Sequence, residues 1–161
     1  MKTLRLDTAV EKTLYAGISI TFGILIIACV LQVFTRFVLN SSLSWTEELA
    51  RYAFIWSNFL GAAVCTKKCS HATVTAVTDL LPAQAKRVSR LLVNTVICLI
   101  ALVFIFYGFK VAFAVRTQLS PALRISMGLV YGAAPVSGLF IFYYSFGQLL
   151  ETVKNFSGRR A

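Results

Sequence analysis

The sequence has few of the side chains that soluble enzymes use for chemistry. Only 6 of its 161 residues are Asp or Glu, three are proline and one is histidine, His71. A single histidine excludes a bis-histidine haem on this chain. The sequence also lacks a Ser/His/Asp set, a cluster of metal ligands and a Gly-rich phosphate loop. We therefore expect no catalytic residue, no metal and no cofactor here, and we predict that the chain is not an enzyme.

The four cysteines form no pattern of a disulfide framework or a zinc site. Cys29 and Cys98 lie inside long apolar runs, where a thiol behaves as a small apolar side chain. Cys65 and Cys69 are four positions apart and so do not form a CxxC pair. A four-helix thiol oxidoreductase working with a quinone is one alternative. It would need cysteine pairs in the outer loops, which contain none.

Apolar surface is what the chain has in abundance. Hydrophobic residues make up 58% of it, which is too much for an ordinary soluble domain. The uncharged runs hold 23, 15, 19 and 26 residues, at Thr13–Thr35, Tyr52–Thr66, Leu91–Phe109 and Ile125–Leu150. A membrane-spanning helix needs about 20 residues. The second run is long enough only if its helix begins near Trp45, which places three charged residues in its first turns.

These runs predict an all-α integral membrane protein with one domain, residues 1–161, and four transmembrane helices. The predicted spans are 13–38, 45–66, 88–112 and 125–150. Between the second and third spans, Val74, Val77 and Leu81 recur at helical spacing. This spacing predicts a short amphipathic helix in the membrane interface, the alternative being a disordered loop. Pro82 suits a first helical turn, so we expect the next helix to begin near Ala83.

The basic residues are distributed unequally between the two sides of the predicted bundle. The formal net charge is +10. Eleven basic residues lie at the termini and between the second and third spans, whereas the other side has Arg36, Arg51, Lys110, Arg116 and Arg124. The positive-inside rule then places both termini in the cytoplasm. This distribution favours a topology signal and attraction to anionic lipids over nucleic-acid binding.

The outer end of the second predicted helix carries Glu47, Glu48 and Arg51. Charge near lipid is expensive, so these residues need a structural partner or a function. Ser44 and Glu47 have the spacing of a capping box. Arg51 lies four residues after Glu47 and three after Glu48, so it can pair with either acid.

A short turn can bring Arg36, at the outer end of the first helix, near these acids. We therefore predict one partly buried ion network of Arg36, Glu47, Glu48 and Arg51. Such a network would fix the register of the two helices or dock a partner. The alternative is a capped helix end with a neutralised charge. Trp45 has the character of an interfacial anchor.

Small residues mark two helix faces. Ser57 and Gly61 lie on one face of the second helix, and Gly128 and Gly132 form a GxxxG in the fourth. Both patterns are typical of close helix packing. Pro135 follows and predicts a kink.

A small homo-oligomeric exporter would need an acid in the middle of a span, and this chain has none there. The chain is also too short for two inverted transporter repeats. An accessory or scaffold subunit is therefore the favoured class of protein.

Several segments resemble the small membrane subunit of tripartite ATP-independent periplasmic (TRAP) transporters, the DctQ-type component. The resemblance covers nearly the whole chain. It rests on Arg36-Phe37-Val38-Leu39-Asn40, on Leu43 through Tyr52, on Trp56 and Gly61-Ala62, on Lys67-Lys68-Cys69-Ser70-His71, on Ser120-Pro121-Ala122-Leu123 and on Tyr131-Gly132-Ala133-Ala134-Pro135.

The resemblance implies a subunit of the bacterial inner membrane that braces a large, sodium-coupled membrane subunit. It also implies that the chain helps to receive a periplasmic substrate-binding protein during organic-acid uptake. Sodium is then expected on the large partner. The residues that we expect to serve structure or partner docking are Arg36, Asn40, Trp45, Glu47, Glu48, Arg51 and Trp56, with Arg116 and Arg124 as further docking candidates.

Overall fold

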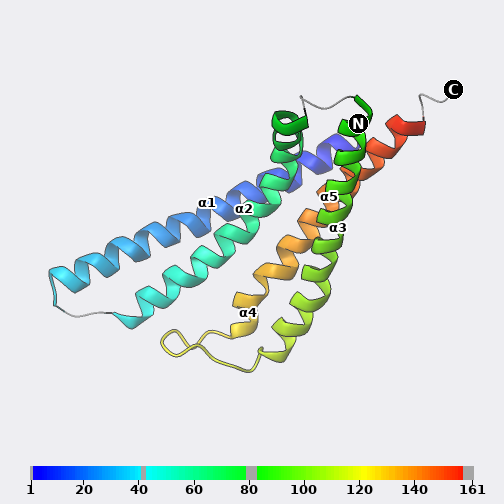
Figure 1. Ribbon diagram of the computed structural model, residues 1–161. Helices are drawn as coiled ribbons and strands as arrows, with labels where there is room; N and C mark the ends of the chain where they lie inside the picture. The colour runs from blue at the N-terminus through cyan, green and yellow to red at the C-terminus, as the bar shows by residue number, and fades with distance from the viewer. Residues whose placement is uncertain (1, 41–42, 79–82, 158–161) are drawn as a thin grey trace. The chain divides into compact units, whose positions relative to one another are not determined.

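The computed structural model describes residues 2–40, 43–78 and 83–157. Their helices are α1 (Lys2–Phe37), α2 (Ser44–Thr78), α3 (Ala83–Ala114), α4 (Met127–Tyr131) and α5 (Ala133–Ser157) (Figure 1). These described residues contain no strand, and one isolated bridge pairs Leu119 with Ser126. The predicted all-α class is therefore confirmed for the described part of the chain.

Three helical segments among the described residues are long and apolar enough to cross a membrane. They are Val10–Phe37, Leu91–Ala114 and Met127–Leu150, and they correspond to the first, third and fourth predicted spans. α2 is not among them, although it has 35 residues. Its first turns carry Glu47, Glu48 and Arg51, which lower its hydropathy.

The predicted separate helix between the second and third spans is not present in that form. α2 instead continues without interruption to Thr78. The sequence has neither glycine nor proline between Gly61 and Pro82, so nothing in it breaks the helix earlier. Residues 79–82 of the predicted segment lie outside the described residues. α3 begins at Ala83, as predicted from Pro82.

The fourth predicted helix is divided at Gly132 into α4 and α5. The Gly132 amide donates to the Gly128 carbonyl at 2.9 Å and closes α4. Pro135 is the third residue of α5, where its missing N–H leaves no intrahelical bond unmade. Pro135 was predicted to kink this helix, but the break lies at Gly132, three residues before it.

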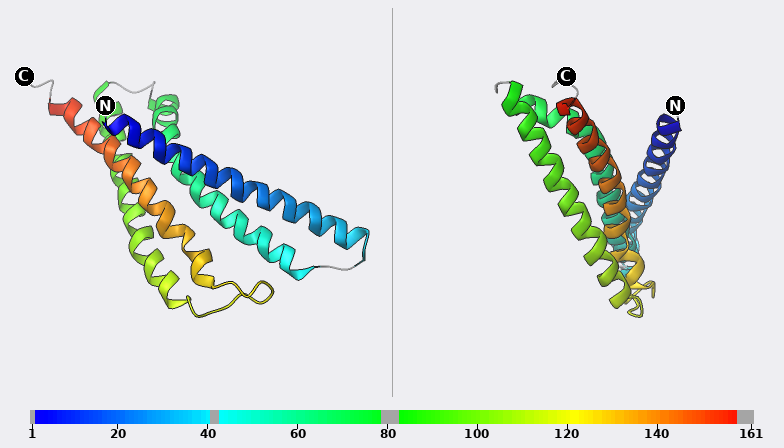
Figure 2. Two further views of the ribbon diagram at one scale, coloured as in Figure 1. Left: turned by 180° about the vertical axis from the view of Figure 1, so that it is seen from behind. Right: turned by 90° about the vertical axis from the view of Figure 1, so that its right-hand side faces the viewer.

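The chain forms two compact units, each built from segments far apart in sequence. The first comprises residues 1–61 and 110–133, and the second comprises residues 62–109 and 134–161. In the first unit, α1 and the start of α2 run antiparallel (Figure 2). The Ser57 hydroxyl donates to Thr21 Oγ1 at 2.9 Å, and Leu60 fills the space beside Gly17.

In the second unit, α3 and α5 pack closely through small residues. A Cβ added at Gly108 would lie 2.8 Å from Pro135 Cδ, and one added at Gly138 would lie 3.3 Å from the Ala101 carbonyl oxygen. Pro135 is therefore a packing residue within this chain. Farther along α5, Gln148 Nε2 donates to the Thr66 carbonyl at 3.3 Å. This bond joins α5 to the part of α2 that belongs to the second unit.

Candidate functional site

The segment between α3 and α4 is a tight hairpin rather than an irregular loop. The Ser120 amide donates to the Ile125 carbonyl, and the Met127 amide donates to the Gln118 carbonyl, each at 2.9 Å. The Ser126 hydroxyl donates to the Arg116 carbonyl at 2.6 Å. These bonds fix the base of the hairpin, and residues 121–124 form its tip.

Glu48 of α2 holds this tip. Its Oε2 accepts hydrogen bonds from the Ala122 amide at 2.9 Å and the Leu123 amide at 2.8 Å, while Oε1 accepts one from the Tyr52 hydroxyl. Glu48 is buried, with 8% of its surface exposed. Hydrogen bonds to an ionised carboxylate are roughly twice as strong as neutral ones. The buried charge of Glu48 is therefore compensated by backbone amides and a phenol.

Tyr52 extends this contact towards α4. Its hydroxyl oxygen lies 3.5 Å from Met127 Sδ, at the point where α4 begins. Glu48 and Tyr52 are one turn apart on α2, so one helix face contacts both the tip and the far base of the hairpin. We call Glu48, Tyr52 and the amides of Ala122 and Leu123 the Glu48 clasp.

The predicted single ion network is wrong. Arg51 Nη2 pairs with Glu47 Oε1 at 3.1 Å, and these two side chains are 65% and 59% exposed. Arg36 is exposed and, within the described part of the chain, forms no ion pair with either acid. Adjacent helical residues point about 100° apart. Glu47 therefore faces outward beside Arg51, whereas Glu48 faces the hairpin.

The predicted capping box is also absent from the described residues. Ser44 is already the first residue of α2, so its hydroxyl is not at the cap position. Thr46 forms the local contact instead: its hydroxyl donates to the Leu43 carbonyl at 2.7 Å, and its amide donates to the same oxygen at 3.2 Å. Thr46 is fully buried.

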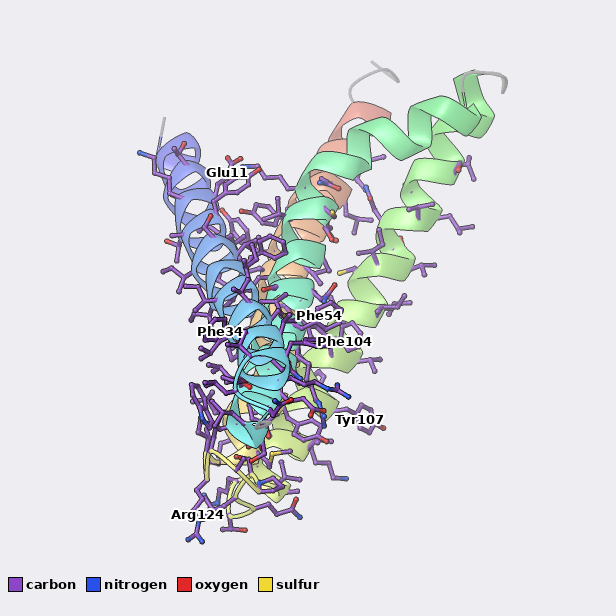
Figure 3. All side chains as sticks on the ribbon, turned by 90° about the vertical axis from the view of Figure 1, so that its left-hand side faces the viewer. Glu11, Phe34, Phe54, Phe104, Tyr107 and Arg124 are labelled. Carbon is purple, nitrogen blue, oxygen red and sulfur yellow. The ribbon has the colours of Figure 1, made fainter. Side chains whose placement is uncertain are left out.

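Two residues outside the helices have left-handed backbone conformations. Asn40, after the end of α1, has φ 48°, and Arg124 has φ 51°. Asparagine tolerates this region well, so Asn40 suits the turn that leads away from α1. Arginine has no such tendency, and surrounding contacts must hold it there. Arg124 lies at the end of the hairpin with its side chain directed away from the helices (Figure 3).

Exposed basic side chains lie on the hairpin and near the helix ends of the first unit, a region that we call the loop end of the first unit. The five basic side chains predicted for the outer side are all exposed and all belong to this unit: Arg36, Arg51, Lys110, Arg116 and Arg124. The acid beside them, Glu47, is already paired with Arg51. Trp45 is exposed near the start of α2, and Trp56 is half-buried.

The small residues predicted for packing divide into two groups. A Cβ at Gly128 would lie 2.8 Å from the Ala112 carbonyl oxygen and 3.0 Å from Arg116 Cα, so Gly128 packs against the end of α3. A Cβ at Gly132 would meet only the backbone of α4, and one at Gly61 would have nothing within 4 Å. Within the described chain, therefore, Gly128 packs against another helix, whereas Gly61 and Gly132 do not.

Sequence reasoning missed the partners of Glu48. In the sequence, Tyr52, Ala122 and Leu123 stand out only as parts of the segments that resemble the family. The available signal was the four-residue spacing of Glu48 and Tyr52, which places both on one helix face. His71 lies in α2, but its side chain is outside the described residues. The described residues contain no group of three His, Cys, Asp or Glu side chains that could hold a metal ion.

Comparison with known proteins matches the chain to one family of membrane transporters. The family model for the DctQ component of tripartite ATP-independent periplasmic transporters matches residues 25–155. The sialic acid TRAP transporter small permease protein SiaQ of Vibrio cholerae is 30% identical over 124 residues, which cover 76% of this chain and 71% of SiaQ. A Haemophilus influenzae protein assigned as a TRAP transporter small permease protein is 28% identical over 155 residues, covering 96% of this chain and 91% of that protein.

A third relative is much longer than this chain. The sialic acid TRAP transporter permease protein SiaT of Haemophilus influenzae is 27% identical over 139 residues. The similarity covers 86% of this chain but only 21% of SiaT. The chain is thus similar to one segment of a larger permease protein.

Proposed function

Because the chain belongs to the DctQ family of tripartite ATP-independent periplasmic transporters, we propose that it braces a larger permease subunit and helps a periplasmic substrate-binding protein to dock. The observation that carries this proposal is the family match over residues 25–155. The similarity to one segment of the longer permease SiaT supports a close association with a larger permease chain.

The bracing role is supported by apolar surface that the chain leaves uncovered. Within the most apolar windows of the candidate spans, only 11% of residues are buried at Val10–Phe37 and 6% at Leu91–Ala114. Large side chains such as Ile27 and Phe106 are about 70% exposed. We propose that lipid covers part of this surface and the larger subunit covers the rest. Gly61, which has space beside it in this chain, is a candidate for that contact.

We propose that α2 crosses the membrane as a fourth span and that both termini are cytoplasmic. The 35-residue length of α2 and the distribution of basic residues support this arrangement. The loop end of the first unit then faces the periplasm of a bacterium with an inner membrane. Its exposed arginines would attract an acidic surface on the substrate-binding protein.

The sodium and substrate sites are proposed to lie on the larger subunit. No predicted span of this chain has an acid at its centre to couple to an ion. Organic-acid uptake is proposed from the family and from the sialic acid transporters to which SiaQ and SiaT belong. Under this proposal the chain contributes assembly and docking to transport.

The docking part can be tested by neutralising one arginine at a time. Arg116→Gln and Arg124→Gln should each weaken binding of the periplasmic protein to the assembled membrane complex, with the loss greatest at low ionic strength. Lys12→Gln removes the same charge from an exposed position at the other end of α1 and serves as the control. Equal binding by all three variants would contradict the docking role.

A further inference from the structure

The hairpin tip is held from a distant part of the chain. Glu48 and the amide of Ala122 are 74 positions apart in sequence, yet the carboxylate accepts hydrogen bonds from two consecutive amides of the tip. Arg124 follows these amides directly. The clasp therefore constrains the backbone immediately before the exposed arginine.

Arg124 needs such a constraint. A non-glycine residue in the left-handed region is uncommon, and in a native structure it persists where the surroundings over-determine it. The hydrogen bond from the Ser120 amide to the Ile125 carbonyl fixes the base of the hairpin on both sides of the tip. The Glu48 carboxylate fixes the tip itself. Together they leave the Arg124 side chain directed away from the helices (Figure 3).

We propose that Glu48, assisted by Tyr52, is a positioning residue that sets the hairpin tip in its docking conformation. It does so by holding the amides of Ala122 and Leu123, which presents the Arg124 guanidinium to the periplasmic protein. This proposal rests on the proposed docking function. It assigns the two adjacent acids different tasks: Glu48 shapes the docking surface from within, and Glu47 forms an exposed pair with Arg51.

The first test measures the clasp directly, without reference to docking. Hydrogen exchange of the Ala122 and Leu123 amides is followed in the complex with the larger subunit. Glu48→Ala removes the acceptor and should speed exchange of these amides by about tenfold or more. Glu48→Gln retains an amide oxygen as acceptor and should restore part of the protection. Glu47→Gln, at the neighbouring exposed position, should leave exchange unchanged.

The second test asks whether Glu48 acts through Arg124. Glycine adopts positive φ without strain, so Arg124→Gly keeps the backbone conformation accessible while it removes the guanidinium. The dissociation constant of the periplasmic protein is measured for Glu48→Ala, Arg124→Gly and the double variant. If Glu48 acts by presenting Arg124, the double variant should bind about as weakly as Arg124→Gly alone.

The outcomes separate this inference from the proposed function. Unchanged amide exchange in Glu48→Ala overturns the inference. If Glu48→Ala speeds amide exchange but binds the periplasmic protein as tightly as wild type does, the inference is also overturned, provided that Arg124→Gly weakens that binding. Fully additive losses in the double variant overturn it as well, because Glu48 would then act independently of Arg124. Docking that is unaffected by Arg124→Gly instead contradicts the docking role itself.

Discussion

Glu48 and Glu47 are chemically identical neighbours with different environments. Glu48 is buried and satisfied by two amides and the Tyr52 hydroxyl, whereas Glu47 is exposed beside Arg51. Removing a partner from a buried, hydrogen-bonded group leaves the remaining polar atoms unsatisfied. Removing one member of an exposed ion pair costs little, about 0.2–1 kcal/mol for typical pairs.

We therefore expect Glu48→Ala to lower the thermal unfolding temperature of the detergent-solubilised chain clearly more than Glu47→Ala. In Glu48→Ala the amides of Ala122 and Leu123 lose their acceptor and the hairpin loses its tie to α2. Circular dichroism or a thiol-independent dye assay measures the difference. Equal unfolding temperatures for the two variants would show that the clasp contributes nothing to stability.

Residue spacing could predict local pairs but not the clasp. The spacing of Arg51 from Glu47 and Glu48 predicted that it could pair with either acid on the helix surface, and the structure pairs it with Glu47. In the hairpin, Glu48 contacts backbone amides that lie far along the chain. Backbone amides are present whatever the residue type, so the residue types could not predict this contact. Arg36 was predicted to join the network from the shortness of the turn alone, but in the described part of the chain it forms no ion pair with Glu47 or Glu48.

At the scale of the helices, close approach depends on individual glycines rather than on the GxxxG pattern. Gly128 lies against the backbone of α3, whereas the space beside Gly61 is open. Overpacking a tight contact typically costs about 1–3 kcal/mol. Replacing an unconstrained helical glycine by alanine gains up to about 1 kcal/mol.

Gly128→Ala and Gly61→Ala should accordingly change stability in opposite directions in the isolated chain. The first should be destabilising by about 1–3 kcal/mol, because a Cβ meets the Ala112 carbonyl oxygen and the Arg116 backbone. The second should be neutral or slightly stabilising. Unfolding in denaturant measures both. A destabilised Gly61→Ala variant would contradict the helix packing described for the first unit.

The helix boundaries could be predicted where a residue type enforces them. Pro82 predicted the start of α3 at Ala83, whereas the kink predicted at Pro135 is not the boundary, because the break lies at Gly132. The continuation of α2 to Thr78 was missed because the change from apolar to amphipathic spacing suggested a new element. A change of pattern alters which face is apolar, but it does not break a helix that lacks glycine and proline.

At the scale of the whole molecule, the proposed topology places the hairpin outside and the first turn of α3 inside. Single cysteines at Arg116→Cys and Lys86→Cys, in a background without the four native cysteines, test it. An impermeant thiol reagent added to intact cells should label the first. It should label the second only after the membrane is opened. The reverse pattern would contradict the orientation and place the exposed arginines on the wrong side for docking.

The central claim is that this chain functions as one subunit of a larger transporter and not as a transporter by itself. Its family match, its similarity to a segment of a longer permease and its largely uncovered apolar helices all support that claim. The competing small exporter would instead assemble from copies of this chain alone. The two accounts therefore differ in what accompanies the chain in the membrane.

Native mass spectrometry of the tagged chain, purified in mild detergent from its own host, tests this claim most directly. Our account predicts a heteromeric complex with a second, larger polytopic protein whose sequence identifies it as a TRAP permease subunit. Gly61→Leu, at a position with nothing within 4 Å in this chain, should reduce the proportion of that complex. Recovery of the chain only as homo-oligomers, with substrate uptake by those homo-oligomers in liposomes, would contradict the account.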